Sequence, residues 1–228
     1  RVAFCFPDTY EIGMSNLGMR ILYGVMNNMD GVWCERVFAP WGDMEDAMRQ
    51  NNIPLWALES QDHIKDFDMI AFTIGYEMAY SNILNMLNLA GVPLHSKDRH
   101  DLKNIVFAGG VCAFNPEPLA DFIDFFALGE GEEITQEIIT LYDRAKAEGW
   151  SKDCYLQEVS KIPGIYVPSF YDVTYHEDST IKAYTPKYDD IPVRVTKRIM
   201  KDMDKAFFPK QVVVPYIETV QDRIMLEV

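Results

Sequence analysis

Two short apolar runs, each ending in glycine, carry the clearest chemical signal in this sequence. The runs at residues 105–108 and 122–128 stop at Gly109-Gly110-Val111 and at Gly129-Glu130-Gly131. A glycine lets a ligand approach the backbone closely because no Cβ intervenes. The Glu130 carboxylate could accept hydrogen bonds from hydroxyl or amide groups, whereas an anionic group would be repelled. The same residues could equally be plain turns, with the acidic side chains offsetting a helix dipole.

Two further loops follow apolar runs and offer polar side chains and glycines. Their candidate residues are Asp8, Tyr10, Gly13 and Asn16 in the first loop, and Thr73, Gly75 and Tyr76 in the second. In a doubly wound α/β fold, such loops lie at the carboxyl ends of the strands, where ligands bind. The first loop lacks the G-x-G-x-x-G spacing, so the usual dinucleotide site is not predicted.

Metal chemistry and nucleophilic catalysis are not predicted. The cysteines Cys5, Cys34, Cys112 and Cys154 form no C-x-x-C pair, and their spacing suits neither zinc nor an iron–sulfur cluster within this chain. The four histidines fall in polar segments without helical ligand spacing. Asp98-Arg99-His100 begins like a D-x-H-x-x-G pattern, but Lys103 replaces the glycine and the segment precedes the fourth strand.

Composition narrows the class of protein. The chain has 228 residues, 48% of them hydrophobic, and a net charge of −14. Such an acidic chain is a poor ligand for nucleic acid, because phosphate backbones would be repelled. No run is long and apolar enough to cross a membrane, and the cysteine usage fits a reducing cytoplasm. Both ends look cut from strand-like sequence, which favours a fragment of a longer protein.

Five strand-like runs predict an open parallel sheet of Rossmann-like, flavodoxin-like α/β class. The predicted strands are residues 2–6, 32–38, 69–74, 105–108 and 122–128, in the order 2-1-3-4-5 with intervening helices. Ser15 or Asn16 is expected to cap the helix after the first strand, and Asp43 the helix after the second. The last helix is expected to end at Gly149.

Three parts are predicted along the chain. Residues 1–149 form the α/β domain, and residues 150–192 form an extended appendage with a hairpin across 171–175 and 181–184. Residues 193–228 are expected to be a linker that ends in a buried strand at 223–228.

Several blocks together resemble the N-terminal, cobalamin-binding-like region of a bacterial radical S-adenosylmethionine (radical SAM) family. The blocks are PDTYEIGMSNLGMRILY, ERVFAPWGDMEDAM, AGGVCAFNPEPLADFIDFFALGEGEE and PGIYVPSFY. In that family a strand similar to DRIMLEV leads into a C-x-x-x-C-x-x-C loop, whose cysteines hold a [4Fe–4S] cluster that cleaves S-adenosylmethionine. The resemblance therefore implies that cluster and S-adenosylmethionine belong to a part of the longer protein that follows this chain.

The resemblance also implies that cobalamin, if bound, lies over the carboxyl ends of the strands. The contacting loops would be residues 8–16, 73–76, 109–111 and 129–131. The cobalt-ligating histidine of many cobalamin domains has no counterpart here. A second reading is an interaction or substrate-gating domain that keeps only the fold, which bulky Tyr10, Tyr76 or Phe114 in the crevice would favour. A flavodoxin-like electron carrier ranks last, because the first loop lacks a hydroxyl-rich phosphate site.

Two partners are expected. The radical SAM barrel of the same polypeptide would cover the exposed aromatic residues of the C-terminal segment. Without the barrel, these residues could pair two copies of this chain into a homodimer.

Overall fold

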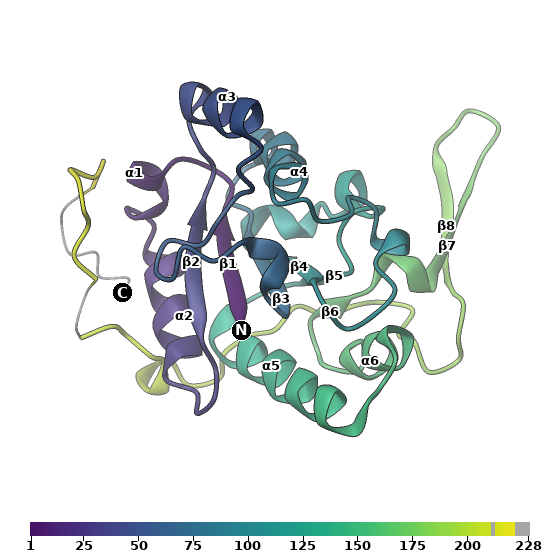
Figure 1. Ribbon diagram of the computed structural model, residues 1–228. Coiled ribbons are helices and arrows are strands. Elements are labelled where there is room, and N and C mark those ends of the chain that lie inside the picture. Colours follow the sequence, from purple (N-terminus) through teal and green to yellow (C-terminus); the bar gives the residue numbers. More distant parts are fainter. Residues whose placement is uncertain (211–212, 222–228) are drawn as a thin grey trace.

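The chain folds around a six-stranded sheet whose first five strands are parallel. The computed structural model describes residues 1–210 and 213–221 (Figure 1). The sheet order is β2-β1-β3-β4-β5-β6. Its strands are β1 (Val2–Phe6), β2 (Cys34–Phe38), β3 (Met69–Thr73), β4 (Ile105–Gly109), β5 (Phe125–Ala127) and β6 (Ile165–Tyr166). The predicted order of the first five strands is confirmed, and β6 adds an antiparallel edge.

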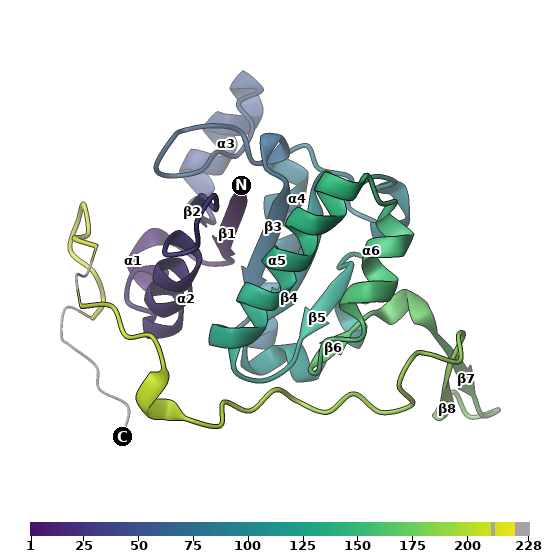
Figure 2. The same cartoon turned by 90° about the horizontal axis from the view of Figure 1, so that it is seen from below.

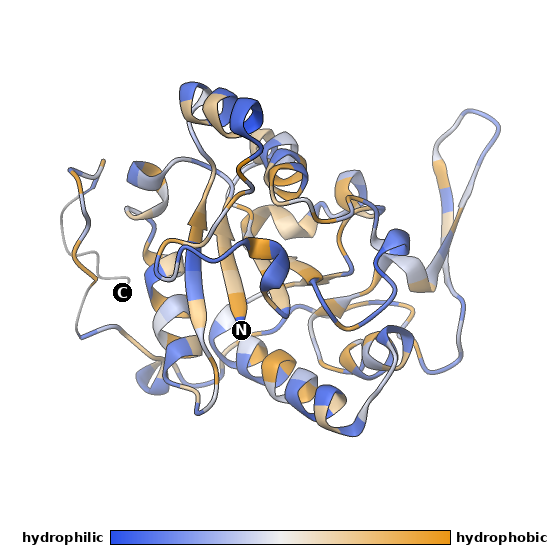
Figure 3. Ribbon diagram, in the orientation of Figure 1, coloured by the Kyte–Doolittle hydropathy of each residue, from blue (hydrophilic) through white to orange (hydrophobic). Residues whose placement is uncertain are grey.

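Helices cover both faces of this sheet. They are α1 (Tyr10–Gly13), α2 (Leu17–Asn27), α3 (Gly42–Asn51), α4 (Tyr80–Leu89), α5 (Gly131–Glu148) and α6 (Lys152–Val159). Helices α2 and α5 lie on one face, and α3 and α4 lie on the other (Figure 2). The central strands are apolar throughout because both of their faces are covered, as the hydropathy colouring shows (Figure 3).

Short elements depart from the sequence-based expectation. Strand β5 begins at Phe125, because the N–H of Phe122 closes a turn onto Leu119 and leaves residues 122–124 outside the strand. Two 3-10 turns, Val111–Phe114 and Glu117–Leu119, join β4 to β5 in place of a helix. Prolines in this connection remove the N–H groups that a longer helix would need.

Of the two cap predictions, one is confirmed and one is wrong. Asn16 caps α2, since its side chain accepts a hydrogen bond of 2.9 Å from the N–H of Met19. Helix α3 begins at Gly42, after an extended Trp41, and the Asp43 carboxylate accepts only from the neighbouring N–H of Met44. Asp43 therefore lies within the first turn, where its charge offsets the helix dipole.

The hairpin prediction is also confirmed. Strands β7 (Tyr171–Tyr175) and β8 (Ile181–Pro186) pair antiparallel and stand away from the body in Figure 1. Strand β6 joins the main sheet, and α6 packs beside α5. The division of the chain at residues 149 and 192 stays a prediction, and the strand predicted at residues 223–228 lies outside the described residues.

A buried carboxylate ties α6 to the amino edge of the sheet. Asp124 accepts a hydrogen bond of 2.7 Å from the N–H of Val106 and pairs with Lys152 at 2.7 Å and with Arg99 at 3.1 Å. The Lys152 ammonium also donates to the carbonyls of Ser96 and Arg99. Each of these charges is nearly inaccessible to water, so its partners are needed to offset the cost of burial.

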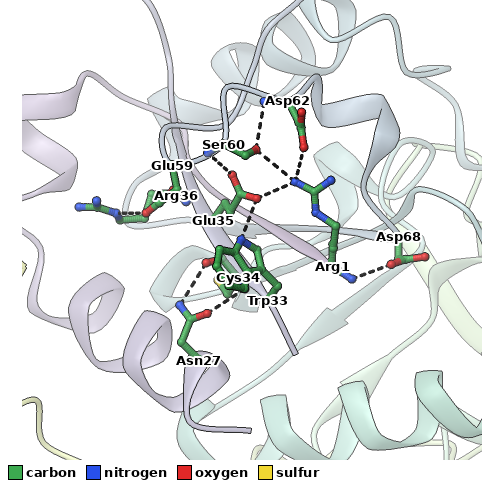
Figure 4. A network of polar contacts seen from close by, with 10 residues as sticks. All are labelled: Arg1, Asn27, Trp33, Cys34, Glu35, Arg36, Glu59, Ser60, Asp62 and Asp68. Carbon is green, nitrogen blue, oxygen red and sulfur yellow. Dashed lines mark hydrogen bonds and ion pairs between the residues drawn. The ribbon is translucent and has the colours of Figure 1, made fainter. Parts of the chain in front are cut away.

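The outer edge of β2 is occupied by side chains and a neighbouring segment (Figure 4). The amide side chain of Asn27 bonds both the N–H and the carbonyl of Cys34. The Glu59 carboxylate accepts from the N–H of Arg36, whose carbonyl accepts from the N–H of Leu58. The outward backbone groups of Cys34 and Arg36 in this edge strand are therefore satisfied within the chain.

Next to this edge, the buried Glu35 carboxylate organises a polar network (Figure 4). It accepts from the Arg1 guanidinium at 2.6 Å, from the Trp33 indole at 2.9 Å and from the N–H of Ser60 at 2.8 Å. Burial alone would raise the pKa of Glu35, but the hydrogen bonds from Ser60 and Arg1 hold this pKa below its ordinary value. The folded state therefore favours the charged carboxylate.

We predict that Glu35 contributes to acid sensitivity. A carboxyl group whose pKa is lower in the folded state stabilises the fold above its unfolded pKa, and this contribution is lost as the pH falls through the folded pKa. Urea titrations from about pH 6 down to about pH 3 should show a falling free energy of unfolding, with a shallower fall for Glu35→Gln. The exposed hairpin residue Glu177 offers the control Glu177→Gln, which should keep the wild-type slope. An equal slope for Glu35→Gln would contradict the assignment.

Candidate functional site: the carboxyl edge of the sheet

The loops that follow β1, β3, β4 and β5 gather at the carboxyl edge, and two of the predicted residues meet there. The Tyr76 hydroxyl donates a hydrogen bond to the Asp8 carboxylate. This contact crosses the gap between β1 and β3, where the strand order reverses. The hydrogen bond to the carboxylate, together with burial, raises the pKa of Tyr76 to about 12. The phenol therefore stays protonated and acts as a donor.

Three predicted residues of the first loop are engaged within the chain. The Tyr10 ring lies edge-on to Phe38 at 5.1 Å, and its hydroxyl accepts from the N–H of Tyr216 at 2.7 Å. A Cβ on Gly13 would lie 2.6 Å from the Phe38 ring, so glycine is required there for packing. Asn16 is the cap of α2. Ligand contact by these residues remains a prediction.

The Gly109-Gly110 pair fits the loop after β3 rather than an open space. Gly110 has a φ of 102°, and a Cβ there would lie 2.7 Å from the carbonyl oxygen of Ile74. The N–H of Ile74 donates to Gly109, and the N–H of Cys112 donates back to Ile74. In contrast, a Cβ added to Gly75 would have no neighbouring atom within 4 Å. Val111 follows the pair and is 77% exposed.

The Gly129 turn is in contact with a distant part of the same chain. Gly129 has a φ of 107° and forms a parallel bridge with Arg198, whose backbone nitrogen would lie 2.6 Å from a Cβ. The N–H of Arg198 donates to Leu128 at 2.8 Å, and its carbonyl accepts from the N–H of Glu130 at 3.2 Å. The carboxylate of Glu130, proposed from the sequence as a ligand acceptor, accepts from the N–H of Met200.

Residues 193–210, which we term the strap, run along the carboxyl edge (Figure 2). The Arg198 guanidinium pairs with Glu133 at 2.9 Å and with Glu137 at 2.6 Å on α5. Farther along, Phe207 packs against Gly24 in the middle of α2, where a Cβ would lie 2.7 Å from the ring atom Cζ. The strap therefore spans from β5 to α2 and uses two glycines as contact points.

An apolar cavity of about 160 Å³ lies beside this edge, between the sheet and helices α2 and α5. Five glycines and two threonines contribute to its lining: Gly18, Gly109, Gly110, Gly129, Gly131, Thr73 and Thr135. Thr135 is only 6% exposed. Among the described residues, neither threonine hydroxyl forms a hydrogen bond with another group of the chain. The cavity thus offers an apolar space with two unengaged hydroxyls.

All four cysteines are free, and burial raises the pKa of the Cys112 thiol, so this thiol is not an activated nucleophile. Within residues 1–210 and 213–221, no group of histidine, cysteine and carboxylate side chains could hold a metal ion. No helix in the same ranges is long and apolar enough to cross a membrane.

Sequence reasoning missed two features of this edge. Thr135 lies in the apolar stripe of α5, and nothing in the helical pattern distinguishes it from a core position. Arg198 lies 69 positions after Gly129, and the only signal of their contact is the glycine itself. Of the predicted residues, Thr73, Gly109, Gly110, Gly129 and Gly131 line one cavity, whereas Tyr10, Gly13 and Asn16 lie apart from it.

We predict that Gly129→Ala releases the strap. The new Cβ would meet the Arg198 backbone, and alanine is strained at a positive φ. Gly149→Ala is the matched control, because Gly149 also has a positive φ of 69° but open space around its Cβ position. Trypsin should cleave Gly129→Ala after Arg198 and Lys201 about tenfold faster than the wild type and the control. Equal cleavage of the two variants would show that backbone strain alone accounts for the effect.

Comparison with known proteins identifies the family. Residues 18–168, more than half of the chain, match the family model described as the N-terminal part of radical SAM proteins. An uncharacterized protein of Methanocaldococcus jannaschii is 29% identical over 143 residues, which are 60% of this chain and 26% of that protein. This chain therefore spans about a quarter of the length of that relative.

Two solved structures are also similar. Both are of TsrM from Kitasatospora setae, a radical S-adenosylmethionine methyltransferase, one with tryptophan and a SAM analogue and one with cobalamin and a [4Fe–4S] cluster. Each is 14% identical with a TM-score of 0.43, and the matches cover 78% and 84% of this chain but 29% and 31% of TsrM. Similarity at this level carries no conclusion, so the assignment rests on the family match. This chain belongs to the family of N-terminal domains of radical SAM proteins.

Proposed function

We propose that this chain is the cofactor-binding N-terminal module of a radical SAM enzyme and that its cofactor is cobalamin. The cavity at the carboxyl edge is the observation that supports this proposal, because it combines apolar walls with the unengaged hydroxyls of Thr73 and Thr135. A flat aromatic group with acceptor atoms suits such a space, and the benzimidazole base of cobalamin is a group of this kind. When bound, cobalamin would supply a cobalt centre that can carry an alkyl group.

The size of the cavity limits what it can hold. At about 160 Å³ it is smaller than the ~300–1,000 Å³ of typical small-molecule sites, so it could enclose only part of a large cofactor. The remainder would lie over the carboxyl edge. Exposed apolar side chains are present there, with Met78 at 83%, Val111 at 77% and Phe114 at 56% exposure. These residues would pack against the cofactor and exclude water from it.

The protein offers no imidazole at this edge. His95 and His100 precede β4 at the opposite edge, with His95 stacked on Phe122. His176 lies at the tip of the β7–β8 hairpin, and His63 pairs with Trp56. A bound cobalamin would therefore receive no histidine ligand from this chain. The residues that could hold it are backbone groups, the two threonine hydroxyls and the apolar rim.

The activity of the longer protein follows from the family alone. We propose that a [4Fe–4S] cluster and S-adenosylmethionine are held by another part of that protein, because the described residues of this chain provide no cluster ligands. We also propose a cytoplasmic location, which the free cysteines support because thiols stay reduced there.

We predict that hydroxocobalamin binds the purified chain with a dissociation constant of about 1–10 μM, measured by absorbance and calorimetry. Gly109→Val should weaken binding at least about tenfold, because the side chain would enter the cavity. Gly109 suits this test because the new Cβ would lie 3.4 Å from its nearest neighbour, the carbonyl oxygen of Ala127. A side chain added at Gly110 would instead clash with the backbone of Ile74. Gly42→Val, at the start of α3, is the control and should bind normally.

The outcome discriminates between two functions. Binding that Gly109→Val leaves unchanged would show that cobalamin does not use the cavity. The absence of binding by a chain with a normal circular dichroism spectrum would favour the second candidate below.

The second candidate is an interaction or gating domain that retains only the fold. The contact between Tyr76 and Asp8 favours it, because this contact closes the point of strand reversal where a ligand would enter. Tyr10 is covered by Tyr216, and Phe114 remains exposed rather than filling the gap. In this reading the apolar rim of Met78, Val111 and Phe114 would pack against the radical SAM barrel. Pairing of two copies of this chain stays an untested prediction.

We predict that the rim becomes protected in the longer protein. Without cobalamin, the amides of residues 76–80 and 111–115 should exchange with deuterium about tenfold more slowly in the longer protein than in this chain. Met78→Asp should abolish the difference, because a charge cannot be buried there without a partner. Ile53→Asp alters an apolar side chain with 45% exposure away from the rim and should preserve it. Identical exchange rates in both proteins would contradict docking through this surface.

A further inference from the structure

A second and larger cavity lies between α2 and the strap. Its volume is about 510 Å³, which falls within the ~300–1,000 Å³ of typical small-molecule sites. One wall consists of the turn at Gly13-Met14, helix α2 and the side chain of Arg36 from β2. The other wall consists of strap residues 206–210 together with Val213. None of the glycines or threonines that line the cavity of about 160 Å³ contributes to this lining.

The charge of this cavity is opposite to that of the protein. Three cationic side chains line it, those of Arg20, Arg36 and Lys210, and none of its described lining residues is acidic. The whole chain carries a net charge of −14. Three cations at one cavity, of which only Arg36 has a carboxylate partner, create a local positive potential that would attract an anion.

Arg36 is the most buried of the three cations that line the cavity. Its side chain is only 7% exposed, and its Nε pairs with Glu59 at 2.7 Å. Its Nη1 contacts the sulfur of Met14, and its guanidinium lies 5.1 Å from the centre of the Tyr23 ring. Within the described residues, no hydrogen bond engages Nη2. A nearly buried guanidinium therefore keeps one donor nitrogen available beside the cavity.

The other two cations have no carboxylate partner. Arg20 donates from Nε to the carbonyl of Met14 at 2.9 Å, and Lys210 is exposed. Neither forms an ion pair with any residue in the described part of the chain. Since Glu59 balances Arg36, the excess positive charge of the cavity comes from Arg20 and Lys210. Two uncompensated cations at one cavity are sufficient to recognise one acidic group.

The remaining lining is apolar and aromatic. Met14 and Met19 contribute to the lining, and both residues are only 2% exposed. Phe207 enters from the strap and rests on Gly24, and the Tyr23 ring adds a second aromatic wall. Asn28 contributes an amide that has no side-chain hydrogen bond in the described structure. The cavity thus combines a largely apolar and aromatic lining with three cationic side chains.

We propose that this cavity binds a small organic anion with an aromatic body and a single acidic group. The body would lie between Tyr23, Phe207 and the methionines, and the acidic group would face Arg20, Lys210 and the free donor of Arg36. This site is separate from the cavity of about 160 Å³ and does not depend on cobalamin binding. Because its outer wall is the strap, binding would also hold the strap against α2.

The test uses the complete chain and two fluorescent probes that share one aromatic body. Anilinonaphthalene sulfonate carries the acidic group, whereas phenylnaphthylamine lacks it. The anionic probe should bind with saturable, one-to-one fluorescence enhancement. Its binding should weaken as the salt concentration rises, because screening reduces its attraction to the cations. The neutral probe should show little dependence on salt.

Two variants test whether the charge of the cavity or its shape determines probe binding. Asn28→Glu places a carboxylate in the lining and Lys210→Gln removes a cation, and each should weaken the anionic probe about tenfold while changing the neutral probe less than about twofold. Asn51→Glu makes the same change as Asn28→Glu on exposed α3 and should alter neither probe.

Three results would overturn the proposal. One is the absence of saturable binding of the anionic probe. Another is equal weakening by Asn28→Glu and Asn51→Glu, which would indicate attraction to the whole surface. The third is an equal loss of binding of the anionic and the neutral probe in Asn28→Glu and Lys210→Gln. That result would show that the variants deform the cavity and that the charge of the cavity does not select the ligand.

Discussion

The close approach of two backbones at Gly129 and Arg198 fixes the arrangement of the carboxyl edge. Hydrogen bonds on both sides of Gly129, to the carbonyl of Leu128 and from the N–H of Glu130, hold Arg198 in place. A side chain on Gly129 would prevent this contact. The strap passes through this contact. Farther along the chain, the strap supplies one wall of the cavity of about 510 Å³ that Arg20, Arg36 and Lys210 line. One residue without a side chain therefore determines which surfaces of the sheet edge remain open.

Much of the fold could be predicted because its main signal is long and repetitive. Five strand-like runs bounded by glycine, proline or polar segments predicted the five parallel strands, and the runs of β1, β3 and β4 are largely apolar because both faces of these strands are covered. Elements of two to four residues, such as β6 and α1, escaped prediction. Their conformation is decided by tertiary neighbours rather than by local periodicity. The start of α3 at Gly42 shows the same limit, because several residues there could cap a helix.

For the candidate site, only its general location at the carboxyl ends of the strands could be predicted from the sequence. The glycine pattern predicted close approach of a ligand, and at Gly110 and Gly129 the groups that approach are backbone atoms of Ile74 and Arg198. A sequence does not reveal whether such a space belongs to a ligand or to the chain. The cationic cavity was not predictable at all, because Arg20, Arg36 and Lys210 come from a helix, a strand and a distant segment. Their common environment arises only when the strap crosses α2.

The side chains along β2 have a consequence for how this protein behaves at high concentration. An edge strand with free N–H and carbonyl groups is a template for the addition of strands from other molecules, and this is a common route to aggregation. Asn27 engages both backbone groups of Cys34, while Glu59 and Leu58 engage those of Arg36. These contacts leave a second molecule few partners along this edge. Strand β2 therefore offers few free backbone groups on which a strand of a second molecule could be added.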